Sequence, residues 1–401
     1  MMKLVKIGFL VSCVLLLNLS TLQAQGNPGD QMGQGDTKRF SPINTAVPSL
    51  SIAPDARGGA MGDNGVASGS DIASQYWNPA KYAFNYSAAG VGLSYTPWLR
   101  KLVNDVALAY LSGFYKLGQY DNQAVGASLR YFTLGEVPIY REGETSPSNY
   151  LNPYELAVDL SYSRKLSESY SMAVALRYIH SDMSDQESEM TAGSSFAADV
   201  SGYAEKYVFL GESESLWTFG FNASNIGTKI SYDGGQRNQF IPTTLRLGTG
   251  LLYPLDEYNR IGFYLDLSKY LVPTYPLQNG DESDDDFDIR REDYNSMSFM
   301  KGIFKSFSDA PGGFSEEMKE VNISLGAEYS YDDKFFIRGG YYYENPDKGN
   351  RQYFSLGAGF RMSVFQLDAA YLISTVPSNP LDQTLRFSLS FDMDGIKNLL
   401  Q

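Results

Sequence analysis

The sequence predicts an all-β protein whose main part is a 14-stranded antiparallel transmembrane β-barrel. The first observation is that successive segments of about 9 to 14 residues alternate apolar with small or polar residues, the period of a strand with two different environments. The second is the aromatic content, 14% of the chain with 30 tyrosines, many of them near segment ends, where a transmembrane barrel carries its aromatic girdles. The third is the alternation of short and long connections between the segments.

Residues 154–163 show the two faces of one such segment. Apolar side chains occupy every second position, and the positions between them are charged, small or hydroxylated. This second face is too polar for the core of a soluble sandwich, whereas a transmembrane barrel turns apolar residues to lipid and polar residues to its lumen. We therefore expect the apolar positions to face lipid. In this segment they are Tyr154, Leu156, Val158, Leu160 and Tyr162.

Fourteen segments carry the pattern, an even number, as in single-chain bacterial barrels. They are predicted at residues 86–97, 104–116, 122–135, 153–166, 170–181, 196–210, 215–226, 243–254, 259–271, 320–331, 335–344, 351–362, 365–375 and 383–393. Short turns of such barrels lie on the periplasmic side and long loops on the exterior. The long connections are 136–152, 182–195, 227–242 and 272–319. A two-residue hairpin is predicted at Ser363–Val364, because the outward parity changes between Met362 and Phe365.

The first 24 residues have the organisation of a Sec-type signal peptide. Two lysines precede an apolar run, and Leu22–Ala24 supplies a small-residue cleavage site. We expect cleavage near Ala24 and export of the mature chain to the outer membrane. The alternative, lipid attachment at Cys13, is disfavoured because the apolar run continues through this residue to Leu17. Cleavage removes the chain's one cysteine, and with it any disulfide or thiolate site.

The composition argues against several classes of function. A formal net charge of −14 is unsuited to nucleic acid, whose binding proteins neutralise phosphates with Lys and Arg. His180 is the only histidine, so a histidine-based metal site is excluded, and no cofactor is expected. A Ser–His lipid hydrolase would need His180 beside a serine and an orienting group. No nucleophile motif accompanies His180, and we expect no enzymatic activity.

Residues 25–85 do not alternate like a strand. They are rich in Gly, Ala, Ser and Asp, which suits compact backbone packed inside a polar lumen, and a flexible secreted leader is the alternative. A short helix is predicted from Asp71 to about Tyr76, with Ser70 as its cap. Pro79 ends it, because the residue before a proline is disfavoured in the α region.

The segment Ala56–Ala83 resembles the N-terminal segment of the FadL-like outer-membrane barrels. The resemblance rests on RGGAMG at 57–62, an Ala-, Ser- and Asp-rich turn of helix, and YWNPA at 76–80. It implies a hatch, residues 25–85, that folds into the mouth of a 14-stranded barrel over residues 86–393. Residues 394–401 would then form a short periplasmic tail. The hatch residues implied in this way are Arg57, Asp71, Trp77, Asn78 and Pro79.

Within this superfamily, residues 41–68 and 86–117 resemble the PorV family, the barrel subunit of the type IX secretion system. The resemblance implies a non-enzymatic protein, embedded in outer-membrane lipid, that binds the giant translocon barrel. Such a protein receives secreted substrates through their C-terminal signal domains and delivers them to the surface attachment complex. A FadL-type transporter of hydrophobic small molecules is the alternative.

The longest predicted exterior loop, residues 272–319, carries two features. The acidic run 281–288 lacks the glycine and the terminal glutamate of an EF-hand calcium site, so it is interpreted as a solvated loop. The alternative is a docking surface for a basic partner or for divalent ions. Residues 296–306 form an exposed, Met-rich apolar stretch, which is typical of a contact surface. The residues expected to bind a partner are Asp281, Asp284, Asp285, Asp286, Met297, Phe299, Met300, Ile303 and Phe304.

Polar-face positions of the predicted strands carry charges of both signs. These charges predict ion pairs that tie the hatch to the barrel wall rather than a selectivity path. The residues are Arg130, Glu155, Asp159, Asp199, Arg246, Asp266, Glu328, Arg338, Arg361, Asp368 and Arg386.

Overall fold

The computed structural model describes residues 41–98, 105–118, 122–139, 146–147, 149–184, 190–235, 237–276, 278, 282–376 and 381–393. All of them belong to the second of two units into which the chain divides, residues 40–401. The predicted signal peptide 1–24, the predicted tail 394–401 and Asp281 lie outside the described residues.

Fourteen antiparallel strands close into one barrel, in which the first strand pairs with the last. They are β1 (Ala89–Pro97), β2 (Val106–Leu117), β3 (Gln123–Leu134), β6 (Tyr154–Lys165), β7 (Tyr170–Asp182), β8 (Gly193–Leu210), β9 (Ser213–Gly227), β10 (Thr244–Pro254), β11 (Asn259–Tyr270), β12 (Asn322–Tyr331), β13 (Phe335–Tyr343), β14 (Gln352–Arg361), β15 (Phe365–Ser374) and β16 (Leu385–Asp392). The predicted strand count is confirmed. A further short hairpin, β4 (Val137–Ile139) with β5 (Asn149–Leu151), lies in a connection that the sequence left as loop.

The two faces of the strands have opposite chemistry, as predicted. In β6, Val158, Leu160 and Tyr162 are exposed on the outer face, whereas Glu155 and Asp159 are buried on the inner face. An outer face that meets hydrocarbon must be apolar, and closure of the sheet leaves no strand edge unpaired within the lipid. Among the described residues, no helix is long and apolar enough to cross a membrane.

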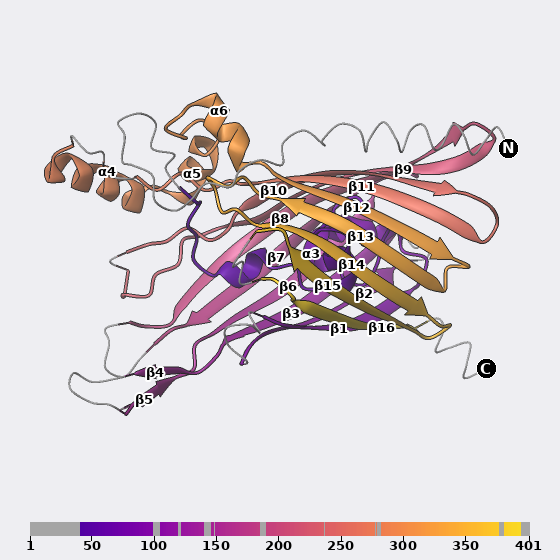
Figure 1. Ribbon diagram of the computed structural model, residues 1–401, viewed down its shortest axis with the longest axis horizontal. Coiled ribbons are helices and arrows are strands. Elements are labelled where there is room, and N and C mark those ends of the chain that lie inside the picture. Colours follow the sequence, from indigo (N-terminus) through magenta and orange to yellow (C-terminus); the bar gives the residue numbers. More distant parts are fainter. Residues whose placement is uncertain are drawn as a thin grey trace. The chain divides into compact units, whose positions relative to one another are not determined.

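The connections differ between the two ends of the barrel (Figure 1). One end, the short-turn end, carries the hairpin turns, the entry into β1 and the end of β16. The predicted turn at Ser363–Val364 is confirmed, since the backbone N–H of Met362 donates to the carbonyl of Phe365 at 2.8 Å. The opposite end, the long-loop end, carries the long connections, including the β4–β5 hairpin and the helices that follow β11.

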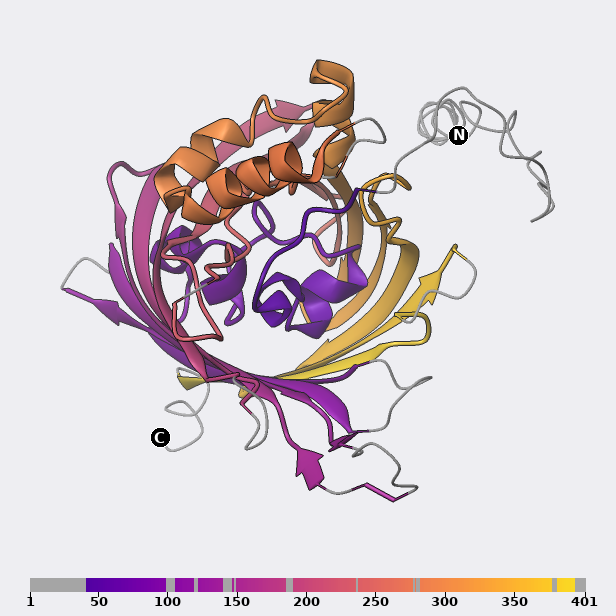
Figure 2. The same ribbon diagram turned by 90° about the vertical axis from the view of Figure 1, so that its left-hand side faces the viewer.

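The described part of the predicted hatch, residues 41–85, lies inside the ring of strands, and "hatch" refers to these residues below (Figure 2). Its elements are the 3₁₀ turn η1 (Pro48–Ser51), the helices α2 (Ala56–Ala60) and α3 (Ser74–Trp77), and the 3₁₀ turn η2 (Pro79–Phe84). The predicted short helix is present, but its predicted start at Asp71 and its cap Ser70 were wrong. Helix α3 begins at Ser74 and Ser70 does not cap it; the hydroxyl of Ser70 instead accepts from the Asn85 side-chain amide at 3.2 Å. The predicted stop is confirmed, because Asn78 is extended before Pro79.

The connection between β11 and β12 folds into α4 (Asp284–Ser296), α5 (Phe299–Lys305), α6 (Phe314–Glu317) and the turn η3 (Met318–Glu320). These helices lie over one side of the barrel mouth (Figure 2). The acidic run was interpreted as a solvated loop; its described part is solvated, but from Asp284 on it is helical and not a loop. Asp284, Asp285 and Asp286 form the first turn of α4 behind the cap Ser283, where carboxylates are favoured by the helix dipole.

Candidate functional site

Ion pairs hold the hatch to the wall, as the mixed lumen charges predicted. Arg57 pairs with Asp71 of the hatch at 2.9 Å and with Glu328 of β12 at 3.0 Å. Glu328 pairs in turn with Arg338 at 2.6 Å, and Arg338 pairs with Asp368 at 2.6 Å. The chain of charges therefore runs from the hatch to β12 and β13 and, across β14, to β15. A second link joins Asp63 of the hatch to Arg386 of β16 at 2.5 Å.

The wall also accepts hydrogen bonds from the hatch backbone. Ala56 N–H donates to Ser388 Oγ at 2.8 Å, and Gly62 N–H donates to Ser355 Oγ at 2.8 Å. The N–H groups at positions 65 and 66 share one carboxylate oxygen of Asp266, at 2.8 and 2.9 Å. Because irregular backbone carries unpaired polar groups, these wall side chains make it possible to bury the hatch. Asp266 was among the lumen charges that the sequence predicted, whereas the serine acceptors Ser355 and Ser388 were missed, although inward hydroxyl positions on the strands are a signal that could have found them.

Trp77, Asn78 and Pro79 form the centre of the hatch. The buried indole of Trp77 donates to Asp55 Oδ1 at 2.7 Å, and Asp55 also caps α2 by accepting from Gly58 N–H. The Asn78 amide donates to the carbonyls of Val66 and Gly202, both at 3.0 Å, and thereby joins the hatch to β8. Pro79 begins η2 at the position where its missing N–H costs nothing.

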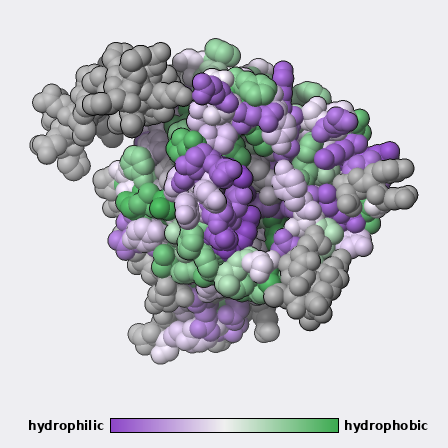
Figure 3. All heavy atoms as spheres, turned by 90° about the vertical axis from the view of Figure 1, so that its right-hand side faces the viewer, coloured by the Kyte–Doolittle hydropathy of each residue, from purple (hydrophilic) through white to green (hydrophobic). Residues whose placement is uncertain are grey.

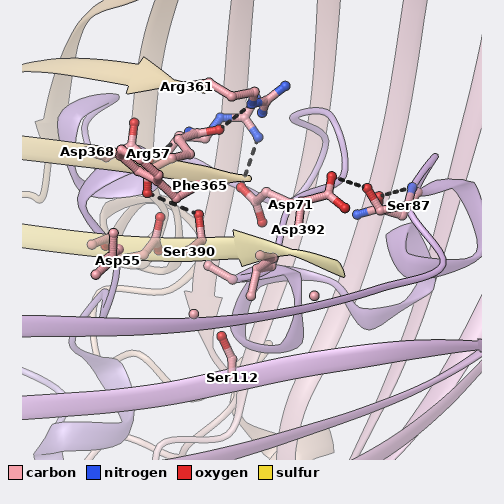
Figure 4. A pocket seen from close by; sticks show the side chains of 18 of the residues that line it. Asp55, Arg57, Asp71, Ser87, Ser112, Arg361, Phe365, Asp368, Ser390 and Asp392 are labelled. Carbon is pink, nitrogen blue, oxygen red and sulfur yellow. Dashed lines mark hydrogen bonds and ion pairs between the residues drawn. The ribbon is translucent and has the colours of Figure 1, made fainter. Parts of the chain in front are cut away.

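A pocket of about 340 Å³ lies between the hatch and the wall formed by β1, β2, β14, β15 and β16 (Figure 4). Its lining includes the carboxylates of Asp55, Asp71, Asp368 and Asp392 and the guanidinium groups of Arg57 and Arg361. Hydrophilic residues also gather over the middle of the short-turn end (Figure 3). Filling the pocket with a hydrophobic molecule would desolvate these charges, which is unfavourable.

The helical loop is anchored to the long-loop end by an apolar cluster. Tyr294 and Met297 are buried against Phe240 and Val272. Lys229, which follows β9, donates to the carbonyls of Tyr294 and Asn295, both at 3.1 Å, and so satisfies the C-terminal end of α4. Burial lowers the pKa of Lys229 to about 8. Met297 is only 6% exposed, so it anchors the loop and the expectation that it contacts a partner directly was wrong.

Ion pairs fix the second half of the loop. Lys269 at the end of β11 pairs with Glu317 at 3.0 Å and with Glu320. Lys348, which follows β13, pairs with Glu320 at 3.1 Å. Asp309 lies beside this cluster and accepts from Thr274 N–H at 2.8 Å. Burial, with the added repulsion of Glu317 and Glu320, raises the pKa of Asp309 to about 6.

The anchored loop exposes several large apolar side chains. We call these side chains the loop face; they are Met300, Phe304, Phe307, Phe314 and Met318. Phe304 is 71% and Phe314 is 80% exposed. Of the other residues expected to bind a partner, Phe299 and Ile303 are half-buried, while Asp284, Asp285 and Asp286 are exposed at the start of α4. The structure thus brings the apolar residues into one folded element and leaves the acidic ones at its beginning.

The family model described as "Type IX secretion system protein PorV" matches residues 35–277, more than half of the chain. The chain belongs to the PorV family. It is therefore an outer-membrane barrel of type IX secretion. A search of curated proteins found no match.

Among solved structures, this PorV-family chain is similar to barrels of low sequence identity. The Ralstonia pickettii toluene transporter TbuX is 12% identical, with 85% of this chain and 96% of that chain covered and a TM-score of 0.42. The Pseudomonas putida toluene transporter TodX is 11% identical, with coverages of 88% and 99% and a TM-score of 0.46. A Pseudomonas aeruginosa FadL homologue is 11% identical, with the same coverages and a TM-score of 0.44.

His180 of this PorV-family barrel has a serine neighbour that the sequence did not reveal. Its Nδ1 lies 2.9 Å from Ser194 Oγ, across the β7–β8 pair. The same hydroxyl lies 3.1 Å from the Tyr178 hydroxyl. A hydrolytic pair also needs a group that orients the ring from its other nitrogen. Within the described ranges, no side chain is within hydrogen-bonding distance of that nitrogen, and no cluster of His, Cys, Asp and Glu is suited to a metal.

Proposed function

We propose that this PorV-family barrel binds the translocon barrel of type IX secretion through its loop face. There it receives secreted substrates by their C-terminal signal domains and passes them to the surface attachment complex. The observation that carries the proposal is a folded, anchored helical loop that exposes five large apolar side chains at the long-loop end. Exposed apolar clusters on anchored elements are typical of interaction sites, because preorganisation lowers the entropic cost of binding.

The lumen supports a binding role over a conducting one. The hatch is tied to the wall by the Arg57–Glu328 and Asp63–Arg386 pairs and by hydrogen bonds from its own backbone. Passage of a substrate would require all of these contacts to break together. The pocket beside the hatch is lined with charges, so it gives no support to the alternative of a transporter for hydrophobic small molecules. We place the long-loop end on the cell exterior, since long loops lie there in barrels of this kind.

The test removes the loop face without removing the loop. In the triple variant Phe304→Ser, Phe307→Ser and Phe314→Ser, only exposed rings are lost, so α5, α6 and their anchors should stay folded. Recovery of a very large second barrel with the tagged protein, after extraction in mild detergent, should fall at least about tenfold. Secretion of proteins with a C-terminal signal domain should fall in parallel.

The matched control is Tyr150→Ser, which removes an exposed ring from the β4–β5 hairpin of another long loop. The control should retain the second barrel at the level of the unaltered protein. Equal recovery with the triple variant and the control would overturn the assignment of the loop face. Recovery of no second barrel even with the unaltered protein would overturn the proposed function itself.

A further inference from the structure

The outer wall has a gap at one level of its side-chain pattern. Strand register places Leu251, Phe263, Ala327, Gly339, Leu356 and Tyr371 side by side across β10 to β15. All six positions face outward, and large side chains occupy four of them. Ala327 and Gly339 are directly paired and leave a space between Phe263 and Leu356. An added Cβ at Gly339 would meet nothing closer than 3.7 Å, an ordinary contact distance, so this position accepts a side chain without a clash.

On the inner side of the same strands, the wall packs closely against the hatch. Inward-facing glycines of β12, β13 and β14 lie against the hatch turn Ala60–Gly62. A Cβ at Gly340 would lie 2.6 Å from Met61 Cα, and one at Gly326 would lie 2.8 Å from Met61 Cβ. These separations are far below ordinary carbon–carbon contact of about 3.5–4.0 Å. The backbones of wall and hatch therefore approach closely, and the outer surface is hollowed over the same strands.

The resulting hollow has a volume of about 1090 Å³ and an apolar lining. It extends from Leu210 and Trp217 past Phe263 and Leu325 to Ile373. Gly339 is the middle residue of β13, so the centre of the hollow lies halfway along a membrane-crossing strand. A lipid headgroup or a charged side chain at this depth would lose its hydration, which restricts the occupant to an apolar one.

We propose that the hollow seats the convex, lipid-facing wall of a second membrane-embedded β-barrel. It would be the in-membrane half of the translocon interface, and this inference rests on the proposed function. Apolar side chains gain little from exchanging lipid for protein, so association within a bilayer depends on close packing at small residues. Ala327 and Gly339 supply such a site at the floor of the hollow, and the large side chains around them form its rim.

The position of the helical loop favours this partner over lipid alone. The loop connects β11 to β12, and both strands contribute residues to the hollow, among them Phe263 and Leu325. The loop face and the hollow therefore lie on the same side of the barrel. One rigid partner standing beside β10 to β14 would meet both surfaces, whereas acyl chains would fill the hollow without any relation to the loop.

The test fills the hollow. Gly339→Leu projects a side chain into open space, and Ala327→Leu fills the same gap from the paired position. Either variant should lower recovery of the very large second barrel about tenfold, with the loop face unaltered. The matched control is Ala127→Leu, an exposed outward position near the middle of β3 on the opposite wall. Protease protection of the hatch should be unchanged in all three, which shows that the barrel is folded.

The outcomes separate the two proposals. Loss of the second barrel with both filling variants, and not with Ala127→Leu, supports the docking hollow. Unchanged recovery with both filling variants overturns it and leaves the loop face standing. If native mass spectrometry instead shows a lipid retained by the unaltered protein and lost from Gly339→Leu, with equal recovery of the second barrel, the hollow is a lipid site and the proposal is wrong. Absence of a second barrel from the unaltered protein removes the proposed function, and the inference with it.

Discussion

Replacing Gly340 with alanine should release the hatch from the wall. The glycine faces inward on β13, and an added Cβ would overlap the carbonyl carbon of Met61 and the nitrogen of Gly62 and lie 2.6 Å from Met61 Cα. Ordinary contact is about 3.5–4.0 Å, so wall and hatch must separate by more than about 1 Å. Overpacking of this kind costs about 1–3 kcal/mol. The adjacent hydrogen bond from Gly62 N–H to Ser355 Oγ, 2.8 Å long, would weaken and add about 1 kcal/mol.

The sum, about 2–4 kcal/mol, should raise the population of the open hatch by a factor of about thirty to several hundred. Trypsin can report this population, because Arg57 and Lys81 lie in the hatch and the side chain of Lys81 is fully buried. When opening is fast relative to cleavage, the cleavage rate follows the equilibrium population of the open form. Gly340→Ala should therefore be cut in the hatch much faster than the unaltered protein in the same detergent.

The neighbouring residue gives the control. Gly339→Ala adds the same methyl group one position along the strand, where its nearest neighbour is Leu356 Cδ2 at 3.7 Å. Its hatch should be cut at the rate of the unaltered protein. Equal cleavage of the two variants would refute the reasoning, because it would mean that the backbone contact between Gly340 and Met61 does not hold the hatch.

Two further predictions concern charge. Arg177→Met should destabilise the barrel by about 3–5 kcal/mol, because Arg177 pairs in the lumen with Asp159 at 2.5 Å and with Asp199 at 3.0 Å, and its loss leaves two buried carboxylates without a cation. The control Arg260→Met breaks an exposed pair with Asp333 and should cost under about 1 kcal/mol. Equal shifts in the thermal unfolding temperature of the two variants would contradict this contrast. The pKa of Asp309 is raised to about 6, so the folded loop binds a proton at this carboxylate more tightly than the unfolded loop does. The loop should therefore become more protease-resistant as the pH falls from 7.5 to 5. This resistance should be lost when the pH is raised again. Asp309→Asn keeps an acceptor for Thr274 N–H and should flatten this profile, and a variant with the unaltered pH dependence would show that another group is responsible.

The strands were predictable because their signal is local. Each segment alternates with period two, and neighbouring strands follow one another in the chain except at the closing β1–β16 pair and where the β4–β5 hairpin intervenes. Some lumen pairs were within reach of the same reasoning. Asp159 lies opposite Arg177, and Glu328 lies opposite Arg338, in the register of consecutive barrel strands. Arg177 was nevertheless missed, because its inward parity was not followed along β7.

The loop and the hatch were harder to predict, for different physical reasons. Ser283 followed by three aspartates is a helix start, yet the acidic run was interpreted by its charge. Because the sequence did not show where α5 begins, it could not show that Met297 is buried whereas Met300 is exposed. The hatch contacts are not local at all. The pairing of Arg57 with Glu328 joins residues 271 apart in the chain, and no period or motif encodes it.

The contacts between the hatch and β16 also set the order in which the molecule can be completed. Ala56 bonds to Ser388 and Asp63 pairs with Arg386, residues 332 and 323 apart, so part of the seat of an early segment is supplied by the last strand. The same strand pairs with β1 and closes the sheet. Contacts of such sequence separation form late, because loop closure must be completed first. Closing of the wall and sealing of the lumen are thus a single terminal event, and a nascent barrel without its last strand would have neither a closed wall nor a fully seated hatch.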